Sequence, residues 1–475
     1  MNSHDTPYQD LAEIERLQLL LARQQAACAA LPFPDLAWRA QRLRALIAAL
    51  RRHQDALVAA VDADFGGRSH SETKLIEVMG PILEARHALA KLRRWMRPKR
   101  RHTEFLFLGN NARVEYQPKG VVGIIGTWNF PVYLTLGPLV AALAAGNRAL
   151  IKGSEYAPQT LLALRKLLAE VFTEDEVAVV GGGPETARAF TALPLNHLVF
   201  TGSPAVGRQV MRAAAEHLVP VTLELGGKSP ALVAPGADLA DAALRIVHGK
   251  VFNAGQICVA PDYALVPRGQ ALAFASAAKA AFARLAPQVG GNGEYTAIIT
   301  ERHAARLNHL VSDALAQGAR VLSCGVEAGP DKRMALQLLL DTKPEMAVMR
   351  EEIFGPLLPI VEYDSLDEAL ALIREGERPL SLYAFGFDGA GRRRLLRESH
   401  AGGVTFDDWG WHVFQHDLPF GGVGNSGMGS YHGEEGFREL SHAKAVFTKR
   451  RWFPIGLFYP PYGNIVQRLA MKLYL

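Results

Sequence analysis

Cysteine is scarce in this chain, which has only Cys28, Cys258 and Cys324 among 475 residues. The three lie far apart and none belongs to a Cys-x-x-Cys pair, so we expect no disulfide framework and a reducing, cytoplasmic setting. Long apolar runs are also missing, because the most apolar segment, residues 136–145, is broken by Pro138 and falls short of the ~20 residues that a membrane span needs. The first ten residues show no basic segment followed by an apolar core, which predicts no secretory signal.

A large excess of one charge is absent as well. Lys and Arg total 52 against 47 Asp and Glu, a net charge of +5 that is too small over this length to indicate a nucleic-acid partner. The densest basic stretch, residues 91–102, is interpreted as the solvated end of a helix that runs into a loop. His412 and His416 have no His-Glu-x-x-His motif or Cys/His cluster beside them, so no metal site is expected. The lack of a Gly-x-Ser-x-Gly motif excludes the usual serine-hydrolase elbow.

The length predicts at least two lobes, because a single hydrophobic core stops growing at roughly 250–300 residues. Apolar residues at three- and four-residue spacing predict helices over 11–30, 37–64 and 71–96. Short apolar runs then alternate with helical segments, which predicts strands at 121–125, 148–152, 177–180, 197–201 and 221–225. This pattern indicates an α/β fold with a doubly wound parallel sheet, whose ligand crevice lies at the carboxyl ends of the strands. A second strand–helix alternation begins after Gly226-Gly227, the expected lobe boundary.

Cys258 is the first candidate for chemistry. A free cysteine is usually a small buried apolar residue, and Cys28 and Cys324 are interpreted that way. Cys258 differs because the preceding residues, 253–256, are small, polar and glycine-containing. Such a segment exposes a side chain and offers backbone N–H groups that stabilise a thiolate or an oxyanion.

Glu224 and Asn129 are placed where a doubly wound sheet binds its ligands. Glu224 ends a predicted strand between two leucines, where burial raises the pKa of a carboxyl group; the alternative is a helix-capping or salt-bridged carboxylate. Asn129 follows the first strand in GTWNFP, and its carboxamide is a candidate oxyanion donor; the alternative is a simple turn residue. Lys152 and Glu155, at the end of the next strand, are candidates for hydrogen bonds to a ribose.

Two glycine clusters compete for a pyrophosphate. Gly181-Gly182-Gly183 follows a strand but lacks a full Gly-x-Gly-x-x-Gly pattern. The segment 201–207, TGSPAVG, also follows a strand, and its Pro204 suits the first turn of a helix whose N-terminus attracts phosphate. We rank the second cluster higher.

Together these motifs resemble the aldehyde dehydrogenase superfamily. GTWNFP, IKGSE, FTGSPAVG, LELGGKSP, GQICVAPDY, EEIFGP and LPFGGVGNSGMGSYHG occur in the family's order and spacing. The closing segment, with GNSGMGSYHG and the YPPYG near Tyr459, is similar to the class 3-type branch, which includes fatty aldehyde and bacterial coniferyl aldehyde dehydrogenases. The resemblance implies a Rossmann-like cofactor lobe, an α/β catalytic lobe and a small β-arm that joins two subunits.

The resemblance also implies roles for individual residues. Cys258 matches the nucleophile, Glu224 the general base and Asn129 the oxyanion donor. The implied cofactor-binding residues are Trp128, Lys152, Glu155, Gly202, Ser203, Gly207, Leu225, Gly226, Glu352 and Phe354. The implied domains are an NAD(P)-binding domain over 1–99 and 120–226, a catalytic domain over 227–425, an oligomerisation arm over 100–119 and 426–450, and a tail over 451–475. Gly153 and Asp407 depart from the family pattern, which usually has proline and asparagine there.

The resemblance implies NAD(P)-dependent oxidation of an aldehyde to a carboxylic acid through a cysteine thiohemiacetal and a thioester. NAD is favoured because Glu155 would repel a 2′-phosphate, with NADP left open. Aromatic residues 128, 130, 133, 409 and 411 suggest a tunnel for aryl, cinnamyl or medium-chain aldehydes. The alternatives are a CoA-acylating enzyme, which retention of Glu224 disfavours, and a non-catalytic binding protein. In the tail, Ile465, Leu469 and Leu473 predict an amphipathic helix that packs on protein over the substrate entrance, with membrane contact as the alternative.

Overall fold

Five apolar runs of the first half of the chain form parallel strands, as the sequence predicts. The computed structural model describes residues 6–325 and 332–475; residues 1–5, part of the segment in which no secretory signal is predicted, lie outside the described residues. The strands are β3 (Val121–Ile125), β4 (Arg148–Lys152), β5 (Val177–Val180), β6 (His197–Gly202) and β7 (Val221–Leu225), joined by α5 (Tyr133–Ala145), α6 (Pro158–Val171), α7 (Pro184–Thr191) and α8 (Pro204–Ala215). The sheet order is β15-β7-β6-β3-β4-β5, so the predicted doubly wound α/β fold is confirmed.

Helices cover both faces of this sheet, and each face has its own hydrophobic core. On one face α5 and α6 pack with α2 (Leu36–Phe65) and α4 (Met79–Met96), and on the other lie α1 (Thr6–Ala30), α7 and α8. Side chains alternate between the cores along each strand: Val122 and Ile124 enter the first core, and Val121 and Ile125 enter the second. The centres of the strands are therefore mainly apolar on both faces, which explains why the sequence shows them as apolar runs.

The third predicted helix, over 71–96, is interrupted. A short α3 (His70–Glu72) is followed by a π-helical turn, Thr73–Val78, before α4 begins. The turn directs the Glu77 carboxylate inward, where it accepts hydrogen bonds from the backbone N–H groups of Val132 (2.9 Å) and Tyr133 (2.8 Å). Such local widening of a helix commonly marks a functional site.

The second lobe is built on a seven-stranded sheet in the order β10-β11-β12-β9-β8-β13-β14. Its strands are β8 (Pro230–Val233), β9 (Tyr263–Pro267), β10 (Arg320–Ser323), β11 (Gln337–Leu340), β12 (Leu357–Tyr363), β13 (Ser381–Phe385) and β14 (Gly403–Phe406). Its helices are α9 (Leu239–Val251), α10 (Ala271–Leu285), α11 (Glu301–Ala316), α12 (Ala347–Arg350), α13 (Leu366–Glu375), α14 (Gly389–Glu398) and α15 (Trp411–Phe414). The predicted second strand–helix alternation is confirmed.

After β14 the chain returns to the first lobe. β15 (Gly427–Met428) pairs antiparallel with β7, and α16 (Gly433–Glu439) packs on α5 and α4. The sequence predicts that the arm begins at residue 426, whereas this end of the chain gives the arm only β16 (Ser441–Thr448). The two-residue strand was missed because it lies within a glycine-rich segment that shows no apolar pattern.

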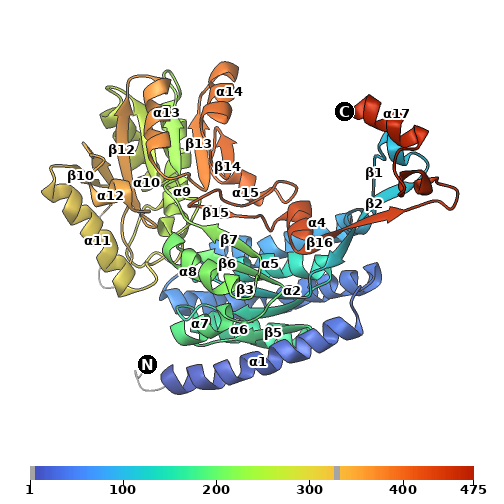
Figure 1. Cartoon of the computed structure of the whole chain (residues 1–475). Coiled ribbons are helices and arrows are strands. Elements are labelled where there is room, and N and C mark those ends of the chain that lie inside the picture. Colours follow the sequence, from blue (N-terminus) through green and yellow to red (C-terminus); the bar gives the residue numbers. More distant parts are fainter. Residues whose placement is uncertain (1–5, 326–331) are drawn as a thin grey trace.

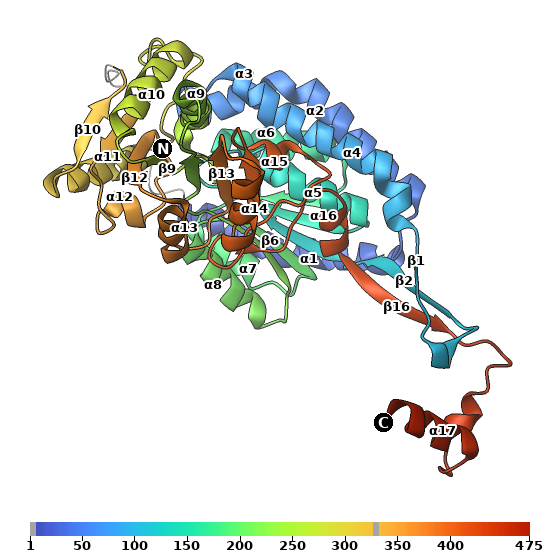
Figure 2. The same cartoon turned by 90° about the horizontal axis from the view of Figure 1, so that it is seen from above.

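A separate three-stranded antiparallel sheet projects from the first lobe as an arm (Figure 2). It consists of β1 (Lys99–Arg101), β2 (Asn111–Pro118) and β16. The basic stretch over 91–102 therefore runs from α4 into a strand, not into the predicted loop. There Lys99 Nζ lies 2.5 Å from Glu434 Oε1.

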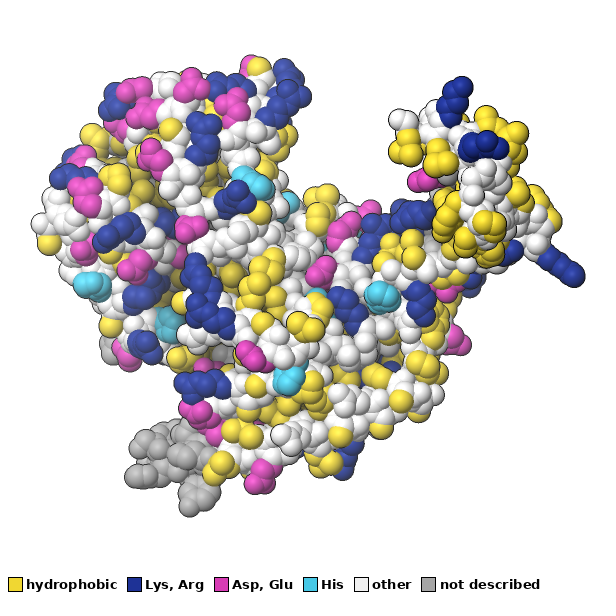
Figure 3. Space-filling view, in the orientation of Figure 1, with side chains coloured by type: hydrophobic (Ala, Val, Ile, Leu, Met, Phe, Trp, Pro, Cys, Tyr) yellow, Lys and Arg dark blue, Asp and Glu magenta, His cyan; other side chains and the backbone are white. Residues whose placement is uncertain are grey.

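The C-terminal tail lies at the far end of this arm. Its helix α17 (Ile465–Tyr474) is amphipathic as predicted, but Ile465, Leu469 and Leu473 are 66%, 61% and 72% exposed. Figure 3 shows apolar side chains gathered beside Lys and Arg around the end of the arm. The arm holds α17 away from the body of its own chain (Figures 1 and 2), so within one subunit the tail does not cover the crevice as expected. Over the described ranges, no helix is long and apolar enough to cross a membrane.

Candidate active site

A cavity of about 890 Å³ opens at the carboxyl ends of the strands, between the two lobes. Most of the predicted site residues line it: Asn129, Glu224, Cys258, Trp128, Gly202, Ser203, Leu225, Gly226, Glu352 and Phe354. Lys152, Glu155 and Gly207 do not line it. The cavity thus brings together side chains from β3–α5, β6–α8, β7 and the second lobe, as a crevice at the carboxyl edge of a parallel sheet requires.

A sharp turn presents Cys258 to the cavity. α9 ends at Val251, and the next turn holds Asn253 and Ala254 in the left-handed region (φ 47° and 50°), followed by Gly255 (φ 71°). A left-handed pair of non-glycine residues is strained, and such strain clusters at functional sites. The turn leaves Cys258 half-buried in the cavity wall.

The thiol of Cys258 is not spontaneously ionised in this arrangement. Burial, followed by the nearby carboxyl groups of Glu352 and Glu224, raises its pKa to about 12, although the backbone N–H groups of Cys258 and Val259 act in the opposite direction. The sequence predicts activation by backbone dipoles or by a base. The dipoles are present but do not outweigh desolvation, so the thiol needs a proton acceptor when it reacts.

Glu224 is buried in β7 and only 3% exposed. Neither carboxylate oxygen has a hydrogen-bond partner among the described residues, which contradicts the salt-bridge and capping alternatives. Burial raises its pKa well above the ordinary value. A carboxyl group with a raised pKa and no hydrogen-bond partner, facing a cavity, is suited to take up and release a proton.

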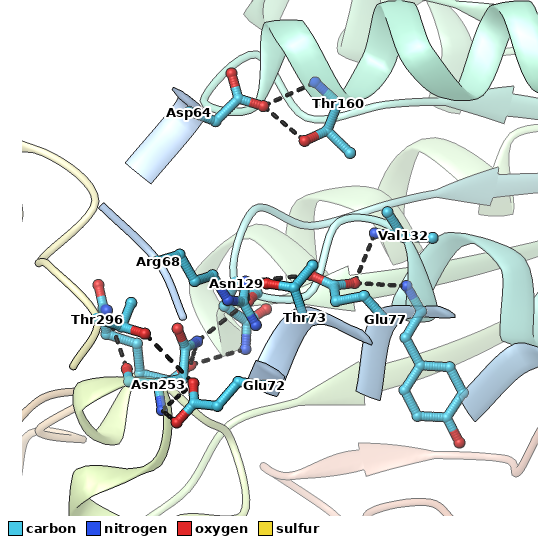
Figure 4. A network of polar contacts seen from close by, with 12 residues as sticks. Asp64, Arg68, Glu72, Thr73, Glu77, Asn129, Val132, Thr160, Asn253 and Thr296 are labelled. Carbon is cyan, nitrogen blue, oxygen red and sulfur yellow. Dashed lines mark hydrogen bonds and ion pairs between the residues drawn. The ribbon is translucent and has the colours of Figure 1, made fainter. Parts of the chain in front are cut away.

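Two side chains from other segments hold the backbone carbonyl group of Asn129 in place (Figure 4). Its carbonyl oxygen accepts hydrogen bonds from Arg68 Nη1 (2.8 Å) and Asn253 Nδ2 (3.1 Å). Its side-chain Nδ2 donates to the carbonyl oxygen of Gln256 (3.1 Å), which uses one of two N–H bonds. The other N–H remains available to a group in the cavity, as an oxyanion donor requires.

A buried polar network supports these two turns, and the sequence analysis did not identify it. Arg68 and Glu77 form an ion pair (3.1 Å) in which both side chains are fully buried, and Glu77 in turn holds the N–H groups at the start of α5. Glu72 accepts a hydrogen bond from the backbone N–H of Asn253 (3.1 Å), and burial raises its pKa to about 7. Figure 4 shows the network reaching from the end of α2 to the turn before Cys258.

The segment 201–207 leads into α8 as predicted. At the competing cluster, Gly181-Gly182-Gly183, a carboxylate of the protein already occupies the start of the helix. Ser203 caps the helix and Pro204 occupies its first position, which leaves the N-terminus facing the cavity. At the other cluster, the Asp10 carboxylate accepts a hydrogen bond from the Gly183 N–H (2.6 Å) and so occupies the start of α7. Gly207 was assigned to the cofactor site, but it lies behind the wall, where a Cβ would come within 2.8 Å of Leu225. Its role is close helix–strand packing.

Glu352 and Gly226 meet across the lobe boundary. A Cβ on Gly226 would lie 1.9 Å from Glu352 Oε2, so only glycine allows this carboxyl group its position. Burial raises the pKa of Glu352 to about 8, and its Oε1 has no partner within the described chain. Asp262, which pairs with Lys228, accepts a hydrogen bond from the N–H of Ile353 (2.9 Å) and so fixes this loop.

Lys152 and Glu155 lie at the end of β4, beside the crevice. The Lys152 side chain is almost fully buried, and its Nζ pairs with Glu155 Oε2 at 2.8 Å. The Gly153 departure is compensated locally, because Leu161 fills the space beside it, 2.5 Å from the position of a Cβ. Asp407 adopts a left-handed conformation (φ 58°) at the surface and pairs with Arg392, so this departure does not shape the cavity.

The aromatic residues do not form the predicted tunnel wall. Phe130 stacks on Phe252 with ring centroids 6.4 Å apart, and Phe252 contacts Trp409 (6.0 Å), forming a cluster beside the Cys258 turn. Trp411 is 61% exposed and Tyr133 is buried, whereas Trp128 lies in the wall against Phe354 (5.3 Å).

The sequence analysis missed three other wall or support residues. Phe252 follows the end of α9 and shows no local signal of a role, and His303 and Arg306 lie on α11, where their spacing looks like a solvated face. The His303 ring packs edge-on against Trp128 (4.8 Å). Across residues 6–325 and 332–475, no group of three or more His, Cys, Asp or Glu side chains could hold a metal ion.

Comparisons with known proteins agree with this geometry. The model of the aldehyde dehydrogenase family matches residues 6–446. The chain is 49% identical over 466 residues to "Probable coniferyl aldehyde dehydrogenase" of Pseudomonas aeruginosa, covering 98% of both chains. It is 43% identical over 448 residues to "Coniferyl aldehyde dehydrogenase" of Pseudomonas sp. (strain HR199), covering 92% of both. Among solved structures it is similar to the "Substrate bound state of Staphylococcus Aureus AldH", with a TM-score of 0.90, 34% identity, and 96% and 99% of the two chains covered.

Proposed function

Because the chain belongs to the aldehyde dehydrogenase family, as an NAD(P)-dependent oxidoreductase that acts on aldehydes, we propose that Cys258, Glu224 and Asn129 carry the reaction and that cinnamyl-type aromatic aldehydes are the substrates. One observation carries the assignment of roles. The three side chains, from segments far apart in the sequence, line the same cavity.

The reaction begins when the Cys258 sulfur bonds to the aldehyde carbon. The thiol proton must leave, because the raised pKa keeps sulfur protonated, and Glu224 in its ionised form is the base in the cavity. The carbonyl oxygen becomes an oxyanion, to which the free N–H of Asn129 and the backbone N–H of Cys258 donate. A nicotinamide held in the crevice would supply the hydride acceptor needed to oxidise this carbon to the level of a thioester. Glu224 releases the thiol proton to solvent and then takes a proton from water as the water oxygen bonds to the thioester carbon. The C–S bond breaks, and the remaining proton of the new acid moves to the sulfur and restores the thiol.

The residues around the crevice fit a dinucleotide. The N-terminus of α8, capped by Ser203, offers backbone N–H groups to a pyrophosphate, and the unpartnered Glu352 Oε1 offers an acceptor to a ribose hydroxyl. NAD is preferred over NADP in this proposal. The Lys152 charge is already paired with Glu155, so a 2′-phosphate would meet a carboxylate and no free cation.

The substrate class is supported by two aromatic side chains that line the cavity, Trp128 and Phe354, whose ring centroids lie 5.3 Å apart. Flat aromatic rings stack favourably on such side chains. Two relatives carry the name coniferyl aldehyde dehydrogenase, and coniferyl aldehyde is a cinnamyl aldehyde. Medium-chain aliphatic aldehydes are the competing substrates.

The proposal also includes a homodimer whose two subunits join through the arm. The arm and tail expose large apolar side chains, among them Phe105 (72%), Phe447 (52%) and Trp452 (67%), a pattern that marks an interaction surface. Three free cysteines suit a cytoplasmic setting. Membrane contact through α17 is the competing use of this surface.

A kinetic panel tests the proposed function. Coniferyl aldehyde, benzaldehyde, hexanal and acetaldehyde are each offered with NAD and with NADP, and the product is identified as the free acid or, with CoA present, the acyl-CoA. We expect the highest kcat/KM for coniferyl aldehyde with NAD, and the acid as product. The Cys258→Ala variant should lose oxidation and keep NADH binding by fluorescence. Normal turnover in that variant would overturn the mechanism, and acyl-CoA as the product would favour the CoA-acylating alternative.

A further inference from the structure

A row of buried polar side chains, which the proposed reaction does not use, leads away from Glu224 toward the surface. Its members, hereafter the polar row, are Tyr431, Glu84, Tyr133, His432, His416, His87 and Asp417. Both Glu84 oxygens, both ring nitrogens of His432 and the hydroxyls of Tyr133 and Tyr431 are buried without a hydrogen-bond partner among the described residues. Buried polar groups normally bond to protein or to ordered water, so such a concentration of unpartnered groups needs an explanation.

The inner end of the polar row lies beside Glu224. β15 pairs with β7 next to Glu224, and the chain that leaves β15 reaches Tyr431, which interacts electrostatically with Glu224. Glu84 of α4 and Tyr431 meet at Gly137 of α5. Glu84 Oε2 and Tyr431 Cε2 each lie 3.1 Å from the position that a Cβ on Gly137 would occupy. The missing Cβ therefore lets Glu84 approach the tyrosine.

The outer end of the polar row contains three histidines whose rings lie next to one another at tilted angles. The His432 ring lies 4.6 Å from that of Tyr431, and His432, His416 and His87 follow one another with centroids 6.3 Å and 6.3 Å apart. His87 Nε2 lies 3.3 Å from Asp417 Oδ1, and the Asp417 side chain is 64% exposed. The polar row thus runs from beside Glu224 to solvent at Asp417.

We propose that the polar row carries protons between Glu224 and solvent at Asp417, an inference that rests on Glu224 acting as the base. In hydrolysis the water oxygen bonds to the thioester carbon, the C–S bond breaks, and one water proton moves to the Glu224 carboxylate. The remaining proton of the new acid returns to the Cys258 sulfur. The proton on Glu224 then leaves along the row, where each group accepts one proton as it releases another, and no group is oxidised or reduced.

The charge states along the row suit this transfer. Burial raises the pKa of Glu84 well above its ordinary value, which favours the neutral carboxyl group, and it lowers the pKa of His432 to about 3, so this imidazole is neutral near pH 7. A neutral carboxyl group and a neutral imidazole each have one donor and one acceptor. The titratable groups facing His432 from other elements are His416 and His412. Those facing His87 are Asp417 and Lys91, and Tyr133 faces Tyr431. Ordered water completes the steps that exceed hydrogen-bond length.

The test separates acylation from hydrolysis without any cofactor. The full-length protein is mixed with 4-nitrophenyl acetate, whose burst of nitrophenolate reports acylation of Cys258 and whose steady rate reports hydrolysis of the thioester. The variants are Glu84→Gln and Tyr431→Phe, with His87→Gln as a change at a half-buried position nearer the surface. Tyr363→Phe is the matched control, because it removes a buried hydroxyl that donates to Val233 (2.7 Å) in the other lobe.

We expect Glu84→Gln and Tyr431→Phe to keep the burst within twofold and to lower the steady rate at least tenfold, with a larger solvent deuterium isotope effect. His87→Gln should slow hydrolysis in dilute buffer and recover in imidazole, while Tyr363→Phe matches the wild type. If Glu84→Gln and Tyr431→Phe leave the steady rate unchanged, or lower the burst as much as the steady rate, the proposal that the polar row carries protons is overturned. If the wild type shows no burst, or Glu224→Gln hydrolyses the thioester normally, the proposed roles of Cys258 and Glu224 fail as well.

Discussion

Arg68 donates a hydrogen bond to the backbone oxygen of Asn129 at 2.8 Å, across the gap between the end of α2 and the first βα turn. Its guanidinium also pairs with Glu77 and lies over the rings of Phe65 and Phe130, 4.7 Å and 4.8 Å from their centroids. A fully buried charge thus holds the residue proposed to bind the oxyanion. The stability of the first lobe and the geometry of the site depend on the same side chain.

Replacing Arg68 by Met should therefore lower the stability of the first lobe and disturb the geometry of the site. The change leaves Glu77 as an unpaired buried carboxylate, which costs about 3–5 kcal/mol, and it frees the Asn129 turn. Urea unfolding should show the lower stability, and the acylation burst should slow at temperatures where the variant is folded. Arg23→Met, which removes an exposed pair with Glu174, is the control and should leave the unfolding midpoint unchanged. A normal burst in folded Arg68→Met would show that the Arg68 network does not determine the geometry of the site.

The Glu224 environment sets the pH dependence of hydrolysis. Glu224 must be ionised to act as a base, and burial raises its pKa well above the usual value, so the thioester hydrolysis rate should rise with pH through that raised pKa. The midpoint of the rising limb of the pH–rate profile should lie above ~4.3, the pKa of an ordinary glutamate. Glu224→Gln should lower the rate roughly 10²–10⁴-fold and remove the limb. A steady-rate profile from pH 5 to 9 checks this, and an unchanged limb in the variant would assign it to another group.

Gly226→Ala should weaken cofactor binding. The new Cβ would lie 1.9 Å from Glu352 Oε2, so the carboxyl group must leave its position. Losing its hydrogen bond to a ribose hydroxyl, worth about 0.5–1.5 kcal/mol, raises the dissociation constant from about twofold to about tenfold. NADH fluorescence titration measures the change. Gly293→Ala, a position with open space beside it, is the control and should bind as the wild type does. Equal affinities for both variants would contradict the role given to Glu352.

Glu155→Gln should shift cofactor preference toward NADP. The change leaves the Lys152 ammonium without its carboxylate partner, and a 2′-phosphate then gains a cation and loses a repelling charge. We expect the ratio of kcat/KM for NADP over NAD to rise roughly tenfold, the effect of one charge-assisted hydrogen bond. Glu185→Gln, at an exposed pair with Arg188, should keep the wild-type ratio. A wild type that already strongly prefers NADP would refute the role of Glu155.

Glu84 should make the protein less stable as pH rises. Its pKa is raised in the folded state, so the folded protein holds a proton that the unfolded chain releases above its ordinary pKa of ~4.3. The favourable contribution is complete below that pH and is lost as pH rises toward the folded-state pKa, by up to ~1.4 kcal/mol per pH unit. Glu84→Gln lacks this dependence. The difference in unfolding free energy between the two proteins, measured from pH 5 to 8, should move in favour of the variant, and a constant difference would contradict the prediction.

The strands and the main site motifs could be predicted because they obey local rules. β3 to β7 are buried on both faces and so appear as continuous apolar runs, and the turn before Cys258 shows its glycine and small polar residues directly in the sequence. Pro204 and Ser203 have the side chains that begin a helix wherever it occurs. These features needed no knowledge of distant contacts.

The buried charges could not be predicted in the same way. Glu77 and Glu84 lie at spacings that an exposed helix face also shows, and Arg68 lies in a loop, so only tertiary packing decides that these side chains turn inward. Phe252 gains its importance from contacts with Phe130 and Trp409, which are more than a hundred residues away along the chain. The polar row combines α4 with the segment after β15, a pairing that no local pattern indicates.

The return of the chain to its first lobe has a consequence for synthesis. The strand that pairs beside Glu224, Gly427–Met428, is translated about 200 residues after it. A nascent chain therefore exposes the edge of β7 while the second lobe is made. The first lobe is finished only after the second lobe has been synthesised.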